Sequence, residues 1–278
     1  MKQLVNPTLQ PYWDWRAAGN FICGGTGTGL VIATALAFVT GVTSWLALLV
    51  GLGFVGLGLF FVWLEIGRPW RAINVFFHPH TSWMTREALL GPPLLASGAA
   101  ALFLDFRFVL LAALFAAGYL YCQARMLHAS RGIPAWCQKE LPLLIFATGL
   151  AEGTGLYLAL AAPTLVMIAA AFAAGIFREI AREFYRRGLF RAHAPAGTLA
   201  WFSRPAEKAL SAGRLASIVL LIVAFGGWPL AALGGLLALV TGWGLKFMLV
   251  TQAAYHRGPV LPCTPVRGRE SSQVVVSS

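Results

Sequence analysis

Eight long apolar segments dominate the sequence, and each comes close to the length that an α-helix needs to cross a lipid bilayer, about 20 residues. The apolar residues are continuous rather than alternating, which favours helices over the strands of a membrane barrel. The segments are residues 21–42, 45–66, 87–104, 106–128, 141–160, 163–181, 211–227 and 229–254. They predict an all-α, polytopic membrane protein with an eight-transmembrane-helix bundle over residues 1–256.

Composition excludes a water-soluble domain. Of the 278 residues, 58% are hydrophobic and 11% are charged, whereas about 25% of residues are charged in a typical soluble domain. Two segments are weaker than the rest. Gly91-Pro92-Pro93 interrupts the third, and only Leu215 to Phe225 of the seventh is continuously apolar. Seven spans plus a re-entrant segment is therefore the alternative.

The basic residues sort to one side of the predicted bundle. If the N-terminus and the even-numbered connections share a face, that face holds every lysine and arginine except Arg107 and Lys246. Because positively charged connections stay in the cytoplasm, both termini are predicted to be cytoplasmic. The N-terminal sequence lacks the pattern of a cleaved signal peptide. Residues 257–278, rich in proline and then serine, are expected to form an extended or disordered cytoplasmic tail.

The longer connections lie on this same face, at residues 67–86, 129–140 and 182–210. Long ordered connections are where docking surfaces and sites are expected, so the site is predicted at the cytoplasmic edge of the bundle. Glu65 ends the second segment's helix, and Arg68 follows three residues later. This spacing suits either an ion pair at the helix end or a carboxylate at the mouth of a ligand site that exchanges protons with water.

Two polar residues fall inside the predicted spans. Glu152 lies near the bilayer midplane, where a charge costs several kcal/mol unless it is paired, protonated or hydrated. It is interpreted as a proton relay or ligand contact, or alternatively as the partner of Lys246. Asn20 lies just inside the bilayer, where its amide needs a partner and can bind a ligand carbonyl. Gly25 and Gly29 form a G-x-x-x-G pair typical of closely packed helices.

Metal and haem sites are not recognisable in the sequence. The four cysteines lack metal-binding spacing. Of the five histidines, only His128 ends a predicted helix, so no pair of axial haem ligands is present. We therefore expect no haem or metal in this chain. The basic and aromatic residues from Arg125 to Trp136 suit either lipid phosphates or an acidic partner subunit.

The Glu-Ile-Gly-Arg-Pro-Trp-Arg string at residues 65–71, the tryptophan- and glycine-rich first helix and the Ser-Trp-Met segment at 82–84 resemble the NrfD/PsrC family of polysulfide reductase-like membrane subunits. The resemblance covers about residues 10–160. It implies a helical bundle in the bacterial cytoplasmic (inner) membrane that binds a quinone, either ubiquinone or menaquinone. It also implies two partners, an iron–sulfur electron-transfer subunit and a molybdopterin catalytic subunit of a molybdenum or tungsten (DMSO-reductase-type) oxidoreductase.

The resemblance implies roles for individual residues as well. The quinone site is expected to contain Trp15, Asn20, Glu65 and Arg68. Glu65 is expected to handle protons there, and Glu152 is added as a relay on the argument above. The residues expected at the partner interface are Arg16, Arg71, Asn74, His78, Trp83, Arg86, Arg131 and Trp136.

The predicted topology bears on the direction of the reaction. Because the connections that carry these residues are predicted to be cytoplasmic, the partner subunits are expected in the cytoplasm. The complex is then expected to reduce quinone while it oxidises a substrate such as an acyl-CoA or a sulfur compound. Two other functions stay open. One is a secondary transporter that uses Glu152 and Lys246 as substrate or proton sites, and the other is an anchor that binds no quinone.

Overall fold

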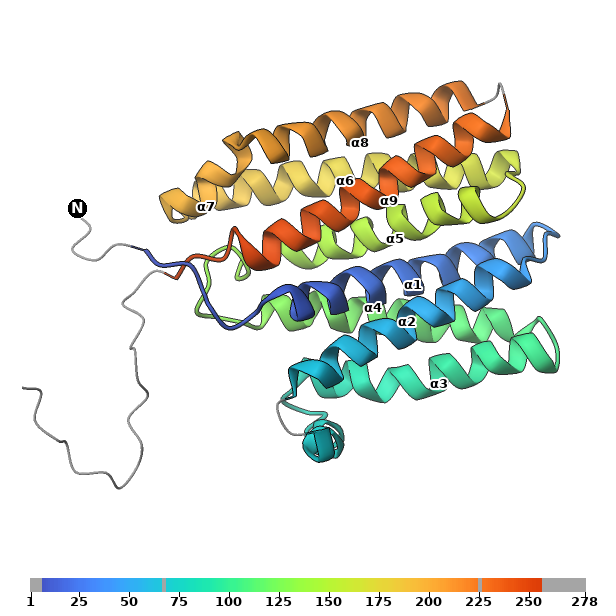
Figure 1. Cartoon of the computed structure of the whole chain (residues 1–278), viewed down its shortest axis with the longest axis horizontal. Helices are drawn as coiled ribbons and strands as arrows, with labels where there is room; N and C mark the ends of the chain where they lie inside the picture. The colour runs from blue at the N-terminus through green and yellow to red at the C-terminus, as the bar shows by residue number, and fades with distance from the viewer. Residues whose placement is uncertain (1–6, 67–68, 225–226, 257–278) are drawn as a thin grey trace, which may run out of the picture.

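The computed structural model describes residues 7–66, 69–224 and 227–256. Eight long helices run side by side through this part of the chain (Figure 1). They are α1 (Trp15–Val39), α2 (Trp45–Glu65), α3 (Trp83–Phe103), α4 (Phe108–His128), α5 (Leu141–Leu160), α6 (Leu165–Arg191), α8 (Pro205–Val223) and α9 (Trp228–Thr251). The shorter elements are the 3-10 helices η1 (Pro69–Phe77) and η2 (Trp201–Ser203) and the helix α7 (Ala196–Ala200).

The all-α prediction is confirmed for the residues that the structure describes, and every predicted apolar segment corresponds to a long helix. Five of these helices, α1, α2, α4, α5 and α9, are long and apolar enough to cross a membrane. Such helices are characteristic of a helical membrane protein. The tail predicted at residues 257–278 lies outside the described residues.

The observed helices extend beyond some predicted boundaries. Helix α6 continues to Arg191 and α8 begins at Pro205, whereas the apolar segments end at residue 181 and begin at residue 211. The extra turns carry arginines and glutamates, which hydropathy excludes from a span although they favour helix. The two prolines of the third segment, Pro92 and Pro93, lie within α3 without ending it.

Polar side chains begin several of the helices. Asp14 accepts a hydrogen bond from the Arg16 backbone N–H at the start of α1. Ser82 caps α3 through the Thr85 N–H, and Thr164 caps α6 through the Met167 N–H. These caps satisfy backbone donors that a helix leaves without an internal partner, each contributing about 1 kcal/mol. Short polar connections therefore determine where the apolar helices begin.

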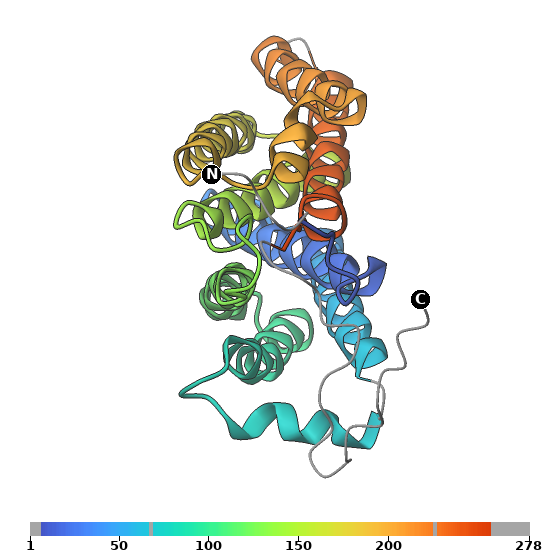
Figure 2. The same ribbon diagram turned by 90° about the vertical axis from the view of Figure 1, so that its left-hand side faces the viewer.

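Helix α1 lies at the centre of the bundle and contacts α2, α4, α5 and α9. The end-on view in Figure 2 shows α3 below the centre and α8 above it. Helix α3 packs on α4, and α8 packs on α9 and α6. The first four helices and the last four thus form two groups that meet chiefly where α1 crosses α5.

Glycines allow α1 and α5 to approach closely. A Cβ atom added to Gly153 would overlap the backbone of Gly29, and one added to Gly29 would overlap the backbone of Gly149. Small residues at such crossings let two helices pack backbone to backbone, which is how helices associate in a lipid environment. The packing role predicted for Gly29 is confirmed.

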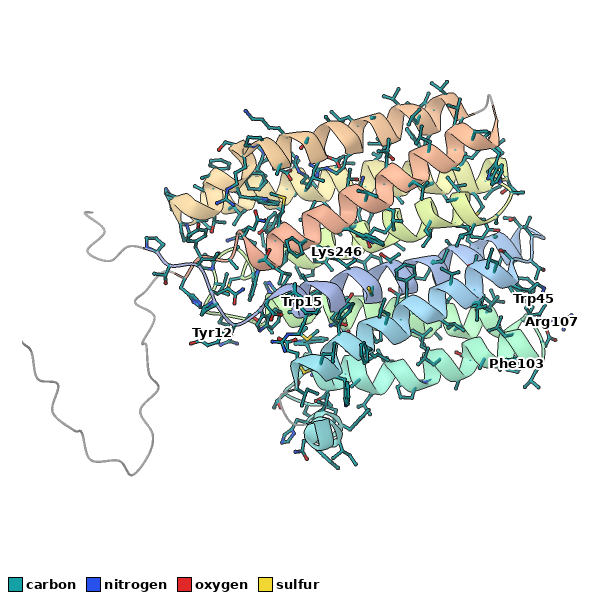
Figure 3. All side chains as sticks on the ribbon, in the orientation of Figure 1. Tyr12, Trp15, Trp45, Phe103, Arg107 and Lys246 are labelled. Atoms are coloured by element: carbon teal, nitrogen blue, oxygen red, sulfur yellow. The ribbon has the colours of Figure 1, made fainter. Side chains whose placement is uncertain are left out.

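The two ends of the bundle differ in their connections. The long connections that contain η1, residues 129–140 and α7 lie at one end, together with Tyr12 and Trp15, whereas Trp45 and Arg107 mark the other end (Figures 1 and 3). Residues near both described ends of the chain meet at the first end, where the Gln10 N–H donates to the Ala254 carbonyl at 2.9 Å. We call this the connection end.

The α1–α5 crossing generates a stability prediction. Gly153→Ala is expected to lower the free energy of unfolding by about 1–3 kcal/mol, because the new methyl group overpacks the crossing. Gly53→Ala in α2 is the control, since a Cβ there meets no atom within 4 Å. Thermal unfolding of both purified variants, followed by tryptophan fluorescence, measures the difference. Equal midpoints for Gly153→Ala and the wild type would show that the two helices are not in contact.

Candidate functional site

A buried ion pair joins α5 to α9. The Lys246 ammonium donates to Glu152 Oε2 at 2.6 Å, and both side chains are fully buried. Thr26 of α1 donates its hydroxyl to the same carboxylate oxygen at 2.9 Å, and the Trp243 indole N–H donates to the Thr26 hydroxyl at 2.9 Å. In Figure 3, Lys246 lies inside the bundle, between the labelled ends. Three helices that are distant in sequence thus share one polar centre.

Glycines make the space that this ion pair occupies. A Cβ atom on Gly25 would collide with the Lys246 ammonium, and one on Gly242 would press against the Glu152 carboxylate. The second carboxylate oxygen of Glu152, Oε1, has no hydrogen-bond partner among the described residues. The pair is therefore neutral overall but retains an unused acceptor in the interior.

A second polar cluster lies between α1, α3 and α4. Glu87 is 2% exposed, and its Oε1 lies 3.4 Å from Gln123 Nε2, which also donates to the Asn20 backbone carbonyl at 3.0 Å. The side chains of Asn20 and Tyr119 lie against the Glu87 carboxyl group. The Asn20 Oδ1 and Tyr119 hydroxyl oxygens have no hydrogen-bond partner among the described residues. Asn20, predicted as a ligand contact, thus belongs to a buried carboxyl–amide cluster.

The two clusters approach each other at Gly25. A Cβ atom on this glycine would meet Lys246 Nζ on one side and would lie 3.5 Å from Gln123 Oε1 on the other. Gln123 Oε1 is itself buried without a hydrogen-bond partner. Polar side chains therefore form a line across the bundle from Glu87 through Gln123 and Lys246 to Glu152. We call these four residues the polar line.

Sequence reasoning did not select Glu87 or Gln123. Glu87 stands at the first residue of a predicted apolar segment, where a carboxylate looks like the end of a polar connection. Helix α3 begins four residues earlier, at Trp83, and so carries Glu87 into the interior. The signal in the sequence is a carboxylate next to an apolar segment. It is overlooked because the apolar segment begins at residue 87, whereas the helix begins at Trp83.

A third buried group contains arginines that the sequence count places on the cytoplasmic side. Arg178 and Arg214 are fully buried between α6, α8 and α9. Glu207, 1% exposed, accepts from Arg214 at 2.9 Å and from Arg182 at 2.6 Å. Arg178 donates to the Ala238 carbonyl at 2.8 Å. Sequence counting missed this arrangement because it treats each arginine as solvated, whereas here carboxylates and carbonyls replace the water.

Glu65 lies apart from the polar line, at the last residue of α2 and half-buried. Arg16 lies close to it, forms an ion pair with Asp14 at 3.0 Å and donates to the Leu64 carbonyl at 3.2 Å. The Arg16 guanidinium lowers the pKa of the Asp14 carboxyl group. Trp15, predicted at the quinone, is largely exposed and packs edge-on against Phe61.

The expected Glu65–Arg68 contact stays a prediction, because Arg68 lies outside the described residues. The structure therefore brings Arg16 and Trp15 to the Glu65 region, while Asn20 lies deeper in α1, beside Glu87. The carboxylates Glu65 and Glu152 do not share one cluster.

Three of the eight residues predicted at a partner interface are exposed at the connection end. Asn74, His78 and Arg131 are exposed, and the Arg86 guanidinium donates to the backbone oxygens of Pro79 and His80. The side chain of Arg71 lies outside the described residues.

Two predicted interface tryptophans are less accessible. Trp83 is half-buried, and the guanidinium groups of Arg86 and Arg125 lie 4.1 and 5.0 Å from its ring centre. Trp136 is 2% exposed; its indole donates to the Leu249 carbonyl at 3.2 Å, and its ring packs on Trp13. Packing within the connection end therefore accounts for Trp136.

An apolar groove opens between α2, η1 and α3. It has a volume of about 250 Å³, and its lining includes Trp63, Ile66, Phe76, Ala88 and Pro92. Ile66 follows Glu65 directly, and Ala88 follows Glu87. The groove is therefore lined by the residues that follow both carboxylates in the sequence. Its wall is almost wholly apolar.

Comparison with known proteins gives no assignment: no family model matches this chain, and no curated protein matches it. Among the described residues, no group of three or more histidine, cysteine, aspartate or glutamate side chains is arranged to hold a metal ion. The features of this chain that point to a function are therefore the polar line, the groove and the sequence motifs.

The buried ion pair predicts strong energetic coupling. Glu152→Gln or Lys246→Met alone is expected to destabilise the protein by about 3–5 kcal/mol, because each leaves a buried group without its partner. The double variant is expected to be more stable than either single variant. A double-mutant cycle from thermal or denaturant unfolding measures the coupling.

The exposed Asp105–Arg107 pair, 4.0 Å apart at the opposite end, is the control. Asp105→Asn is expected to change stability by less than about 1 kcal/mol. Additive effects of Glu152→Gln and Lys246→Met would contradict a direct pair.

Proposed function

We propose that this chain is the membrane anchor and quinone-binding subunit of a multi-subunit molybdenum or tungsten oxidoreductase. It passes electrons between an iron–sulfur partner subunit and the membrane quinone pool. The observation that carries the proposal is the polar line of Glu87, Gln123, Lys246 and Glu152, buried inside an apolar helical bundle. The resemblance of residues 65–71 to the NrfD/PsrC family supports it from the sequence side.

A quinone takes up two protons with two electrons, so its site needs groups that hold and deliver protons. Carboxyl groups placed beside an apolar site suit this task, because a carboxylic acid can donate a proton to a reacting group and take another up from water. Glu87 and Glu65 are the candidates, since each directly precedes a residue that lines the groove, Ala88 and Ile66 respectively. Glu152, held by Lys246 and Thr26, is the candidate relay deeper in the bundle.

The residues present suit a quinone in two respects. The groove between α2, η1 and α3 has the apolar lining that a quinone ring and isoprenoid chain require. Beside Glu87, the buried Tyr119 hydroxyl and Asn20 amide carry the O–H and N–H donors of the kind that bind a ligand carbonyl. A quinone bound on this side of the bundle would supply a two-electron acceptor, and Asn20 and Tyr119 would hold its carbonyl groups.

The topology completes the proposal. We infer eight membrane spans in a bacterial inner membrane, with the connection end and both termini in the cytoplasm. Three of these helices, α3, α6 and α8, carry more polar residues than a lipid-facing span, and in α6 and α8 the buried arginines and Glu207 account for this. The basic residues of the connection end then face acidic partner subunits in the cytoplasm, with Arg16 and Arg86 at the interface. This orientation favours oxidation of a cytoplasmic substrate and reduction of quinone.

A secondary transporter is the second candidate, and the Glu152–Lys246 ion pair favours it. A fully buried acid–base pair at 2.6 Å changes its net charge when a proton or a charged substrate binds. Transport requires that the pair open to each side of the membrane in turn. A transporter needs no iron–sulfur or molybdenum subunit, so the two candidates differ in whether partner subunits bind to this chain.

Co-purification distinguishes the two candidates. Mild-detergent purification through a C-terminal tag is expected to recover an iron–sulfur chain and a molybdenum or tungsten chain, together with bound quinone. Mass spectrometry, metal analysis and quinone extraction measure these components. A stable, lone, metal-free protein would contradict the anchor proposal and direct the work to transport assays in liposomes.

Quinone reduction by the intact complex tests the carboxylates. Glu65→Gln and Glu87→Gln are each expected to slow it at least tenfold, because loss of a general acid typically costs 10²- to 10⁴-fold. Glu183→Gln is the control, since this carboxylate pairs with Arg186 and Arg187 on α6, away from the polar line. Unchanged rates in assembled Glu65→Gln and Glu87→Gln complexes would identify a purely structural anchor.

A further inference from the structure

A polar pocket at the connection end has no role in the proposed electron transfer. It lies between the start of α3, the end of α4 and the connection to α5, and its volume is about 550 Å³. The side chains that matter are Thr81, Trp83, Arg125, His128 and Arg131. Aspartate and glutamate are absent from its lining, so the pocket concentrates positive charge. We call it the Arg125 pocket.

The two arginines of this pocket lack carboxylate partners among the described residues. Other arginines at this end pair with acids: Arg16 with Asp14, Arg182 with Glu207 and Arg191 with Glu140. Arg125 and Arg131 make no such ion pair within the part of the chain that the structure describes. An arginine pair without acids in a concave site is the arrangement that proteins use to bind anions.

The Arg125 side chain is held in place for this task. Its guanidinium lies over the Trp83 ring at 5.0 Å, and its Nε atom is buried without a hydrogen-bond partner among the described residues. His128 adds a ring whose Nδ1 lies 3.3 Å from the Trp136 backbone oxygen, which restricts its orientation. A buried, unpartnered charged donor costs free energy unless a ligand accepts its hydrogen. The contact with Trp83 thus fixes the Arg125 guanidinium beside the pocket.

We propose that the Arg125 pocket binds the phosphate group of an anionic phospholipid. A phosphate oxygen accepts from the guanidinium of Arg125, a second from that of Arg131, and Thr81 offers a hydroxyl. The volume exceeds that of a bare phosphate and leaves room for a glycerol headgroup. The pocket lies at an end of the helical bundle, beside Trp83 and the exposed Tyr121, where lipid headgroups meet a membrane protein.

This proposal is independent of the proposed quinone chemistry, because none of the pocket residues belongs to the polar line or lines the groove. A soluble phosphorylated molecule presents the same phosphate chemistry and is the other source. The position of the pocket at the end of the bundle favours the lipid, and the experiment below distinguishes the lipid from a soluble phosphorylated molecule.

Native mass spectrometry of the full chain in detergent tests the proposal. The protein is titrated with phosphatidylglycerol or with zwitterionic phosphatidylcholine. Wild type is expected to retain phosphatidylglycerol selectively, and Arg131→Gln is expected to bind it about tenfold more weakly, because a charge-assisted hydrogen bond is lost. Lys139→Gln is the charge-matched control, as Lys139 is exposed in the same connection but outside the Arg125 pocket.

A second arm uses inorganic phosphate, with the thermal midpoint as the readout. Stabilisation by phosphate that Arg131→Gln loses, without selective lipid retention, identifies a soluble phosphate ester as the source and overturns the lipid assignment. If wild type and Arg131→Gln bind both probes equally, or if Lys139→Gln loses as much affinity, the pocket is not a phosphate site. Because Arg131 is exposed, the Arg131→Gln variant is expected to fold as the wild type does.

Discussion

The Glu152–Lys246 ion pair is the interaction on which the interior of the bundle depends. Two opposite charges 2.6 Å apart and fully buried are tolerable only because each offsets the desolvation of the other. The pair requires α5 and α9 to lie side by side, and Thr26 requires α1 to join them. Glycines at 25 and 242 supply the space. The same buried contacts therefore require both the close packing of these three helices and the position of their polar centre.

The cost of burying polar groups also explains why further polar side chains lie next to the ion pair. Gln123 extends toward Lys246 across the gap at Gly25, and its amide reaches Glu87 on the other side. In an apolar bundle each such group needs a polar neighbour, so buried polar residues gather rather than scatter. Several of their atoms retain unused hydrogen-bonding capacity, which is the property expected where protons or ligands are handled.

The connection end shows a different use of charge. Among the described residues, some of its arginines pair with carboxylates, as Arg182 and Arg214 do with Glu207, and others make no such pair, as in the Arg125 pocket. The first kind stabilises helices that carry charge into the bundle. The second kind leaves positive charge available to anionic lipids or partners. The net positive charge of the chain is therefore organised locally rather than spread evenly over one face.

Hydropathy and periodicity in the sequence were sufficient to predict the helices, because a span of about 20 apolar residues has few alternatives to an α-helix in lipid. Glu152 was recognisable for the same reason, as a carboxylate in an apolar run. Its partner stayed open until the tertiary structure placed Lys246 beside it, 94 residues away. The burial and pairing of Glu87, Gln123 and Arg214 became visible only through packing, because they depend on which helix faces meet, and the local sequence does not determine that.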